Sequence, residues 1–353
     1  MSSGPTNLNN DQRFNLADIE DLATAALELW GVKTSPPQLL KHRENTVYRV
    51  EDGSGNPAVL RVHRPGYHDE TAILSELLWM TQLSSSGMDL PRPIPAEDGR
   101  LLVSVGNGHN TDKRYVDVLS WVNGDKMGLT GTPLTLPTDQ IGSLFFRLGY
   151  AAAQLHNLSD RWALPSEFRR HAWDQDGLIG EAPFWGRFWD LPDLGRTDRE
   201  LLVQGREAAS QWLTAYAEQL DYGLIHADLV KENVLIDNGT VRLIDFDDAG
   251  FGWRIFELAT VLLKTRDEPE YPRIKQSLFE GYRNCRTLSA TDEQSLPLFM
   301  MLRSFTYLGW WNERRHEPGM SAHIEPVVAE ARAATRELSL IHISEPTRRT
   351  PIS

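Results

Sequence analysis

The chain has little of what several classes of protein require. Its 353 residues include one cysteine, Cys285, which excludes an intramolecular disulfide framework and a metal cage built from cysteines. No stretch approaches the roughly 20 apolar residues that span a bilayer, and the polar start has no apolar segment typical of a secretion signal. With 41% hydrophobic and 24% charged residues, the chain is expected to be a globular, cytoplasmic protein that does not enter membranes.

Basic residues are scarce as well. Lysine and arginine total 36, against 49 aspartate and glutamate residues, and the formal net charge is −13 at pH 7. Because nucleic-acid phosphates require a basic protein face, this balance argues against nucleic acid as a partner. An acidic surface suits solubility, or a cationic small substrate.

The two ends of the chain are interpreted separately from the rest. Residues 1–12 are expected to be a disordered N-terminus. Residues 338–348 read, on back-translation, like a transposon-end adaptor from a sequencing library, so residues 338–353 are interpreted as an assembly artefact. A genuine tail is the alternative.

Two lobes are expected between these ends. Strand and helix patterns alternate in residues 13–122, helical periodicity dominates residues 123–337, and turn residues stand at the boundary. The predicted fold class is α+β, with a small antiparallel sheet in the first lobe and a mainly helical second lobe. The expected helices are 15–30, 69–83, 138–155, 199–220, 255–264, 270–285, 292–315 and 324–337, and the expected strands are 46–51, 58–63, 101–105, 115–122, 223–226, 234–236 and 241–245.

One pair of motifs carries chemistry. His226-Ala-Asp228-Leu-Val-Lys-Glu-Asn233 is followed, twelve residues past Asn233, by Asp245-Phe-Asp247. Phosphoryl transfer from ATP needs a group that accepts or orients the proton of the attacking hydroxyl, and cations that neutralise the β- and γ-phosphates. Asp228 fits the first role, while Asn233 and Asp245 offer the oxygen ligands that Mg²⁺ prefers. The alternative is that Asp228 and Asn233 only bond their own turns.

On these motifs the chain resembles the aminoglycoside phosphotransferase and choline kinase group of kinase-like enzymes, over about residues 35–337. Within the group it is closest in pattern to homoserine-kinase-like or stress-response-kinase-like members. The resemblance implies a bilobal protein-kinase-like fold with ATP in the cleft, Asp228 as catalytic base, and Asn233 with Asp245 as magnesium ligands. It also implies that His226 braces the catalytic loop.

The sequence departs from the group on the nucleotide side. Arg61 stands where a lysine usually reaches the α- and β-phosphates, and arginine keeps the charge with a different geometry. Glu76 matches the position of the ion-pair partner of that arm, with Glu70 as the competitor. No Gly-x-Gly-x-x-Gly loop precedes the arm, but the turn at 42–47, which contains Asn45, resembles the loop of the group. A plain hairpin loop is equally compatible with that turn.

The region around the motifs favours a small acceptor over a protein. Lys231 stands three residues past Asp228, whereas serine/threonine protein kinases carry their lysine two residues past the aspartate. Only eleven residues separate Asp245 from Glu257, which leaves no room for a long activation segment. The aromatic stretch at 162–189 is either a lid over the acceptor or a brace that packs the second lobe.

Candidate substrate residues lie near and after the motifs. Asp247 is one, and Arg303, Tyr307 and Trp311 share roughly one face of a late helix. An arginine there is suited to a carboxylate and an aromatic ring to an amine. Core packing with exposed arginines is the alternative.

We therefore expect an ATP-dependent kinase that phosphorylates a hydroxyl of a small molecule: an amino alcohol, a hydroxy amino acid, a sugar or an aminoglycoside-like compound. A monomer or a homodimer is expected. A serine/threonine protein kinase is one alternative, and a non-catalytic ATP-binding regulator, which Arg61 would permit, is another. The sequence leaves ATP versus GTP open.

Overall fold

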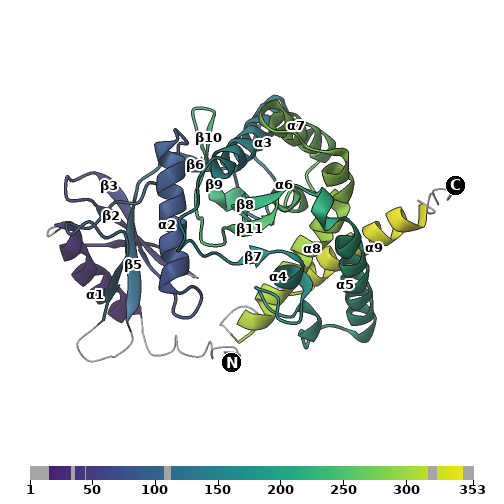
Figure 1. Ribbon diagram of the computed structural model, residues 1–353, viewed down its shortest axis with the longest axis horizontal. Coiled ribbons are helices and arrows are strands. Elements are labelled where there is room, and N and C mark those ends of the chain that lie inside the picture. Colours follow the sequence, from purple (N-terminus) through teal and green to yellow (C-terminus); the bar gives the residue numbers. More distant parts are fainter. Residues whose placement is uncertain (1–15, 33–35, 44, 107–112, 317–323, 345–353) are drawn as a thin grey trace. The chain divides into compact units, whose positions relative to one another are not determined.

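The computed structural model describes residues 16–32, 36–43, 45–106, 113–316 and 324–344 (Figure 1). The chain divides into two compact units, Met1–Gly124 with Trp162–Arg170, and Asp125–Arg161 with His171–Ser353. Residues 162–170, which the sequence interpretation assigned to the helical lobe, therefore group with the unit that contains the larger sheet. The expected disordered segment 1–12 lies outside the described residues.

The first unit contains an antiparallel five-stranded sheet with the order β1-β2-β3-β5-β4. β2 and β3 form the expected hairpin, and Ala58, Leu60 and Val62 are buried on one face of β3, as the alternation predicts. β1 is absent from the strands predicted from sequence, because all its side chains are exposed and its pattern does not alternate. The strands are β1 Gln38–His42, β2 Thr46–Glu51, β3 Pro57–Val62, β4 Val103–Val105 and β5 Arg114–Ser120.

Helices pack on both faces of this sheet (Figure 1). The first helix packs Leu22 against the face that carries Leu60, and Gly31, with φ of 72°, ends the helical turn that follows it. The second helix begins at Asp69, whose side chain accepts a hydrogen bond from the Ala72 N–H, and it reaches the face that carries Arg61. The elements are α1 Leu16–Leu27, the short η2 Glu28–Trp30 and α2 Glu70–Ser85.

The second unit is mainly helical, and its helices lie near the predicted ranges with two exceptions. Gln175–Ile179 was not predicted, and Ile324–Ser344 continues past the predicted end at residue 337. α3 and α7 pack closely, since an added Cβ on Gly281 would lie 1.8 Å from the carbonyl oxygen of Phe146. Across the described residues, no helix is long and apolar enough to cross a membrane. The helices are α3 Thr138–Asp160, α4 Gln175–Ile179, α5 Arg196–Tyr216, α6 Arg254–Leu263, α7 Tyr271–Cys285, α8 Ala290–Arg314 and α9 Ile324–Ser344, with the short helices η3 Phe188–Asp190, η4 Ala217–Gln219 and η5 Lys231–Asn233.

Two three-stranded sheets in the second unit, β10-β9-β6 and β7-β11-β8, position the motif residues. His226 directly follows β8, and Asp245 lies just beyond β10. β11 occupies the short run between Asp245 and Glu257 and was hidden in the sequence because two of its four residues are glycines. The strands are β6 Asp125–Lys126, β7 Ala172–Trp173, β8 Tyr222–Ile225, β9 Val234–Asp237, β10 Thr240–Leu243 and β11 Gly250–Trp253.

The aromatic stretch before the catalytic motif packs into the interior of the second unit. Trp173 is fully buried, and the ring centroids of Trp185 and Phe256 lie 5.3 and 5.7 Å from its own. Phe188 stacks on Phe305 of α8 at 4.2 Å. Trp173, Trp185 and Phe188 therefore belong to a brace that packs the second unit, and not to a lid over the acceptor.

Candidate active site

The catalytic loop begins where β8 ends, with a strained residue. Ala227 has φ of 67°, a left-handed conformation that costs a non-glycine residue about 1 kcal/mol or more. The fully buried carboxylate of Glu257, on α6, accepts hydrogen bonds from the N–H groups of His226 at 3.0 Å and Ala227 at 2.7 Å. Burial raises the pKa of Glu257, while the hydrogen bonds from the two backbone N–H donors oppose that rise. Glu257 thus fixes the backbone that carries Asp228.

His226 has the contacts of a brace. Its Nε2 lies 2.9 Å from the carbonyl oxygen of Ile244, and its Nδ1 lies 3.3 Å from the N–H of Asp228. Nε2 therefore donates and Nδ1 accepts, which defines one neutral tautomer. The ring also lies against Phe246, with 4.6 Å between centroids. His226 links the two motifs through its ring.

Asp228 lies between two donors. Nη2 of Arg303 donates to its Oδ1 at 2.5 Å, and Nδ2 of Asn233 donates to its Oδ2 at 2.8 Å. The same Asn233 nitrogen donates to the backbone carbonyl of Asp228 at 2.9 Å. The Asp228 side chain remains 19% exposed. It is therefore a fixed carboxylate with an accessible edge, as a proton acceptor requires.

The backbone places Asn233 and Asp245 close to each other in the fold. The N–H of Ile244 donates to the carbonyl oxygen of Asn233 at 3.0 Å, and Asp245 is the next residue, again with φ of 67°. The Asn233 amide nitrogen is used by Asp228, so its side-chain oxygen is the atom suited to a cation. In the described part of the chain no group of three or more His, Cys, Asp or Glu forms a metal cage. An amide oxygen plus one carboxylate fits Mg²⁺, which keeps several waters and binds phosphate oxygens.

Arg303 corrects one sequence expectation, because it is not an exposed arginine. Its side chain is 0% exposed. The rings of Trp185, Phe256 and Tyr307 lie 4.7, 5.5 and 4.4 Å from its Cζ. Burial disfavours its charge, but Tyr307 and Asp228 outweigh burial, so its pKa is raised above the ordinary value. Arg303 is a buried cation in contact with Asp228, and substrate contact by Arg303 stays a prediction.

The other candidate substrate residues have different surroundings. The Tyr307 ring lies 3.7 Å from Nζ of Lys264 and 4.4 Å from Cζ of Arg303, and burial raises the pKa of its hydroxyl. Trp311 is half-buried, and Asp247 is buried. Substrate contact by Tyr307, Trp311 and Asp247 stays a prediction.

Lys231 is held by contacts within the second unit. Its Nζ donates to the carbonyl oxygen of Thr132 at 2.8 Å and pairs with Glu268 at 2.5 Å. The neighbouring Glu232 accepts hydrogen bonds from the N–H and the hydroxyl of Thr130. Lys231 therefore ties the loop that contains Thr132 to the loop that carries Asp228.

In the first unit, Arg61 is engaged by two carboxylates. Its Nε and Nη2 donate to the two oxygens of Asp117 at 2.9 Å each, and its Nη1 donates to Glu76 at 2.8 Å. His63 also lies 2.5 Å from Asp117. Burial opposes ionisation of Asp117, but the attraction of Arg61 and His63 outweighs it and lowers the pKa. The ion pair with Glu76 is present, and the phosphate contact stays a prediction.

The other nucleotide-side candidates are placed as follows. Glu70, the competitor of Glu76, accepts a hydrogen bond from the Tyr115 hydroxyl at 3.3 Å. Asn45, at the turn between β1 and β2, accepts one from the N–H of Arg64 at 3.3 Å. Asn45 therefore ties this turn to the residues that follow β3, and its contact with the nucleotide stays a prediction.

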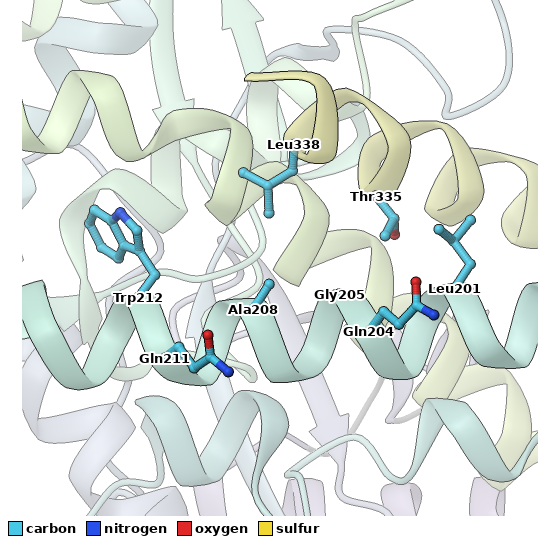
Figure 2. Close-up of a pocket in the computed structure, with 8 residues that line it drawn as sticks. All are labelled: Leu201, Gln204, Gly205, Ala208, Gln211, Trp212, Thr335 and Leu338. Atoms are coloured by element: carbon cyan, nitrogen blue, oxygen red, sulfur yellow. The ribbon is translucent and has the colours of Figure 1, made fainter. Parts of the chain in front are cut away.

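A groove between α5 and α9 lies apart from the candidate site residues described above. Figure 2 shows Gly205 and Trp212 of α5 facing Thr335 and Leu338 of α9. Its lining contains no charged side chain and none of the predicted site residues. α9 continues through residue 344, so the helix includes the first residues of the segment interpreted as an adaptor, and that interpretation stays a prediction.

Sequence reasoning missed two carboxylates that hold candidate site residues in place: Glu257 beside the motif and Asp117 beside Arg61. Glu257 entered only as a marker of spacing, and Asp117 did not enter at all. One signal was present for Asp117: an acidic residue in an apolar strand, Tyr-Val-Asp-Val-Leu, is costly unless it is paired.

Comparison with known proteins agrees with the motif. The sequence model described as the phosphotransferase enzyme family matches residues 37–293. The structure of the microcompartment-associated aminopropanol kinase is 33% identical, covers 91% of this chain and 98% of its own, and superposes with a TM-score of 0.77. An amicoumacin kinase in complex with AMP-PNP and Ca²⁺ is 22% identical, with 93% and 95% coverage and a TM-score of 0.73. The homoserine kinase of Neisseria meningitidis is 31% identical over 48% of this chain and 52% of its own length. These likenesses confirm the predicted α+β, kinase-like fold.

Proposed function

Because the chain belongs to the phosphotransferase enzyme family and is a kinase that phosphorylates a hydroxyl of a small molecule, we propose that its donor is ATP with Mg²⁺ and its acceptor an amino alcohol. The observation that carries the catalytic part is the geometry of Asp228. A carboxylate with both oxygens held, one of them by Asn233, whose backbone in turn bonds the residue before Asp245, is suited to phosphoryl transfer.

Each residue has one task in this proposal. Asp228 accepts the proton of the acceptor hydroxyl, or orients that hydroxyl, as the hydroxyl oxygen bonds to the γ-phosphorus; the bond from that phosphorus to the bridging oxygen breaks and ADP leaves. Asn233 and Asp245 would hold Mg²⁺, which would neutralise charge on the β- and γ-phosphates. His226 and Glu257 keep the backbone of Asp228 in place. On the nucleotide side, Arg61 with Glu76, and Asn45, remain the proposed contributors of the first unit.

The choice of an amino alcohol rests on two observations. The aminopropanol kinase is 33% identical to this chain and is covered along 98% of its length. The formal charge of −13 also favours a cationic acceptor over an anionic one. A hydroxy amino acid is the second candidate, because the homoserine kinase is 31% identical, although over a shorter span.

An acceptor panel tests this proposal. ADP release is measured with aminopropanol, ethanolamine, choline, homoserine, a neutral sugar and an aminoglycoside at equal concentration. The highest kcat/KM is expected for a primary amino alcohol. Asp228→Ala and Asp245→Ala are each expected to abolish ADP release while circular dichroism stays unchanged. Retained turnover in either variant contradicts the catalytic assignment, and preference for homoserine or the sugar contradicts the acceptor class.

A further inference from the structure

We propose that Arg303 is a positioning residue for phosphoryl transfer. Its buried guanidinium fixes the carboxylate of Asp228 in the reactive orientation. This inference rests on the proposed function, because it assigns Asp228 the proton-accepting role. It replaces the expectation that Arg303 binds the substrate. The residue reaches the catalytic loop from α8, 75 positions further along the chain.

The geometry separates positioning from substrate binding. Arg303 is 0% exposed, whereas Asp228 is 19% exposed. A ligand that approaches the accessible edge of Asp228 therefore meets the carboxylate and not the guanidinium. Arg303 contributes one hydrogen bond to Oδ1, while Asn233 contributes one to Oδ2. Together the two donors restrict rotation of the carboxylate about its Cβ–Cγ bond.

The guanidinium is itself held in place by its surroundings. Trp185, Phe256 and Tyr307 lie within 4.4 to 5.5 Å of its Cζ, which stabilises a cation and limits its motion. An isolated arginine buried in this way would be costly, and the negative charge of Asp228 offsets that cost. The arginine and the aspartate therefore depend on each other.

The aromatic support continues to the last described helix. Nζ of Lys264, the residue that caps the end of α6, lies 3.7 Å from the centroid of the Tyr307 ring and 2.9 Å from a carboxylate oxygen of Glu330, on α9. The ion pair with Glu330 holds Lys264 beside Tyr307, and Tyr307 contacts Arg303. Side chains from the end of α6, from α8 and from α9 thus hold Arg303, which in turn orients Asp228.

Substitution of Arg303 has a specific kinetic signature. Arg303→Met removes the hydrogen bond and the charge, and kcat is expected to fall about 10- to 100-fold, the scale of a small misplacement of a catalytic group. The KM for ATP is expected to stay within about threefold, because Arg303 does not contact the nucleotide in this assignment. Arg303→Lys keeps the charge without the planar fork and should recover part of the lost kcat.

A double-mutant cycle with Asp228→Asn tests whether Arg303 acts through Asp228. Asp228→Asn alone is expected to lower kcat at least 1,000-fold, an order of magnitude consistent with loss of a general base. The double variant Asp228→Asn/Arg303→Met should then match Asp228→Asn within about threefold, because the group that Arg303 positions is already lost. Multiplied losses would overturn the inference, since they indicate a separate role.

A matched control accounts for the loss of a buried arginine. Arg254 on α6 is 1% exposed and pairs with Asp160 and Asp221. Arg254→Met should lower the unfolding free energy, yet leave kcat within about threefold of the wild-type value. Wild-type kcat in Arg303→Met, with Asp228→Asn inactive, overturns this inference alone. Full turnover in Asp228→Asn overturns the proposed function itself. If Arg303→Met does not fold, the cycle is carried out with Arg303→Lys and the same outcomes decide.

Discussion

Replacement of Arg61 by the lysine that kinases usually carry should destabilise this protein. Arg61 donates three hydrogen bonds to carboxyl groups, two to Asp117 and one to Glu76, at 2.8 to 2.9 Å and in a buried setting. An ammonium group is a point charge that cannot reproduce the planar pair of bonds to Asp117. If two of the three bonds are lost at about 1.5 kcal/mol each, Arg61→Lys lowers the unfolding free energy by about 3 kcal/mol.

The assay is urea unfolding followed by far-UV circular dichroism, with ATP titrations of the ADP-release rate in parallel. The exposed pair Arg100–Asp98 provides the control, because both side chains are about half exposed. Arg100→Lys should leave the unfolding free energy almost unchanged, because an ion pair in water contributes little. A loss below about 1 kcal/mol in Arg61→Lys would refute the reasoning, since the network would then tolerate a lysine.

Three further predictions concern other buried contacts. Glu257→Gln places an amide NH₂ against a backbone N–H of the catalytic loop, and should lower the unfolding free energy by about 2 kcal/mol and kcat at least tenfold, measured by urea unfolding and ADP release. Gly281→Ala brings a Cβ against the Phe146 carbonyl and should cost about 3 kcal/mol, whereas Gly195→Ala, which meets no atom within 4 Å, should be neutral. The lowered pKa of Asp117 makes its ionised form stabilising above about pH 4, and that stabilisation is lost as the pH falls further. Urea unfolding between pH 3 and 6 should show the loss in the wild type and a flatter profile in Asp117→Asn.

The sequence was sufficient for features that depend on local spacing. Amphipathic helices of the second unit follow from apolar periodicity; α5, for example, buries Leu202, Ala209 and Leu213 along one stripe. The motif from His226 to Asn233 was identifiable because its residues lie within one loop. The catalytic role of Asp228 and the metal roles of Asn233 and Asp245 remain proposals that their arrangement supports.

Contacts between distant segments were not accessible in the same way. In the sequence, Arg303 is one of several arginines on an amphipathic helix. Only the fold shows that its side chain contacts Asp228. Arg61 was recognised as unusual, but its second carboxylate, Asp117, is 56 residues away and pairs with it across adjacent strands. Periodicity assigns a side chain to a face, and it does not identify the partner on that face.

The contact from Arg303 of α8 to Asp228 also bears on how the rate of such an enzyme can change by substitution. The span matched by the family, residues 37–293, includes Asp228, Asn233 and Asp245, and it ends before Arg303. The matched span therefore contains the proposed catalytic aspartate, while the residue proposed to position it lies beyond that span. Under the proposal above, substitutions in α8 would alter catalytic rate while every motif residue stays unchanged. Enzyme engineers who graft new acceptor specificity onto such a core should therefore transfer α8 together with the catalytic loop.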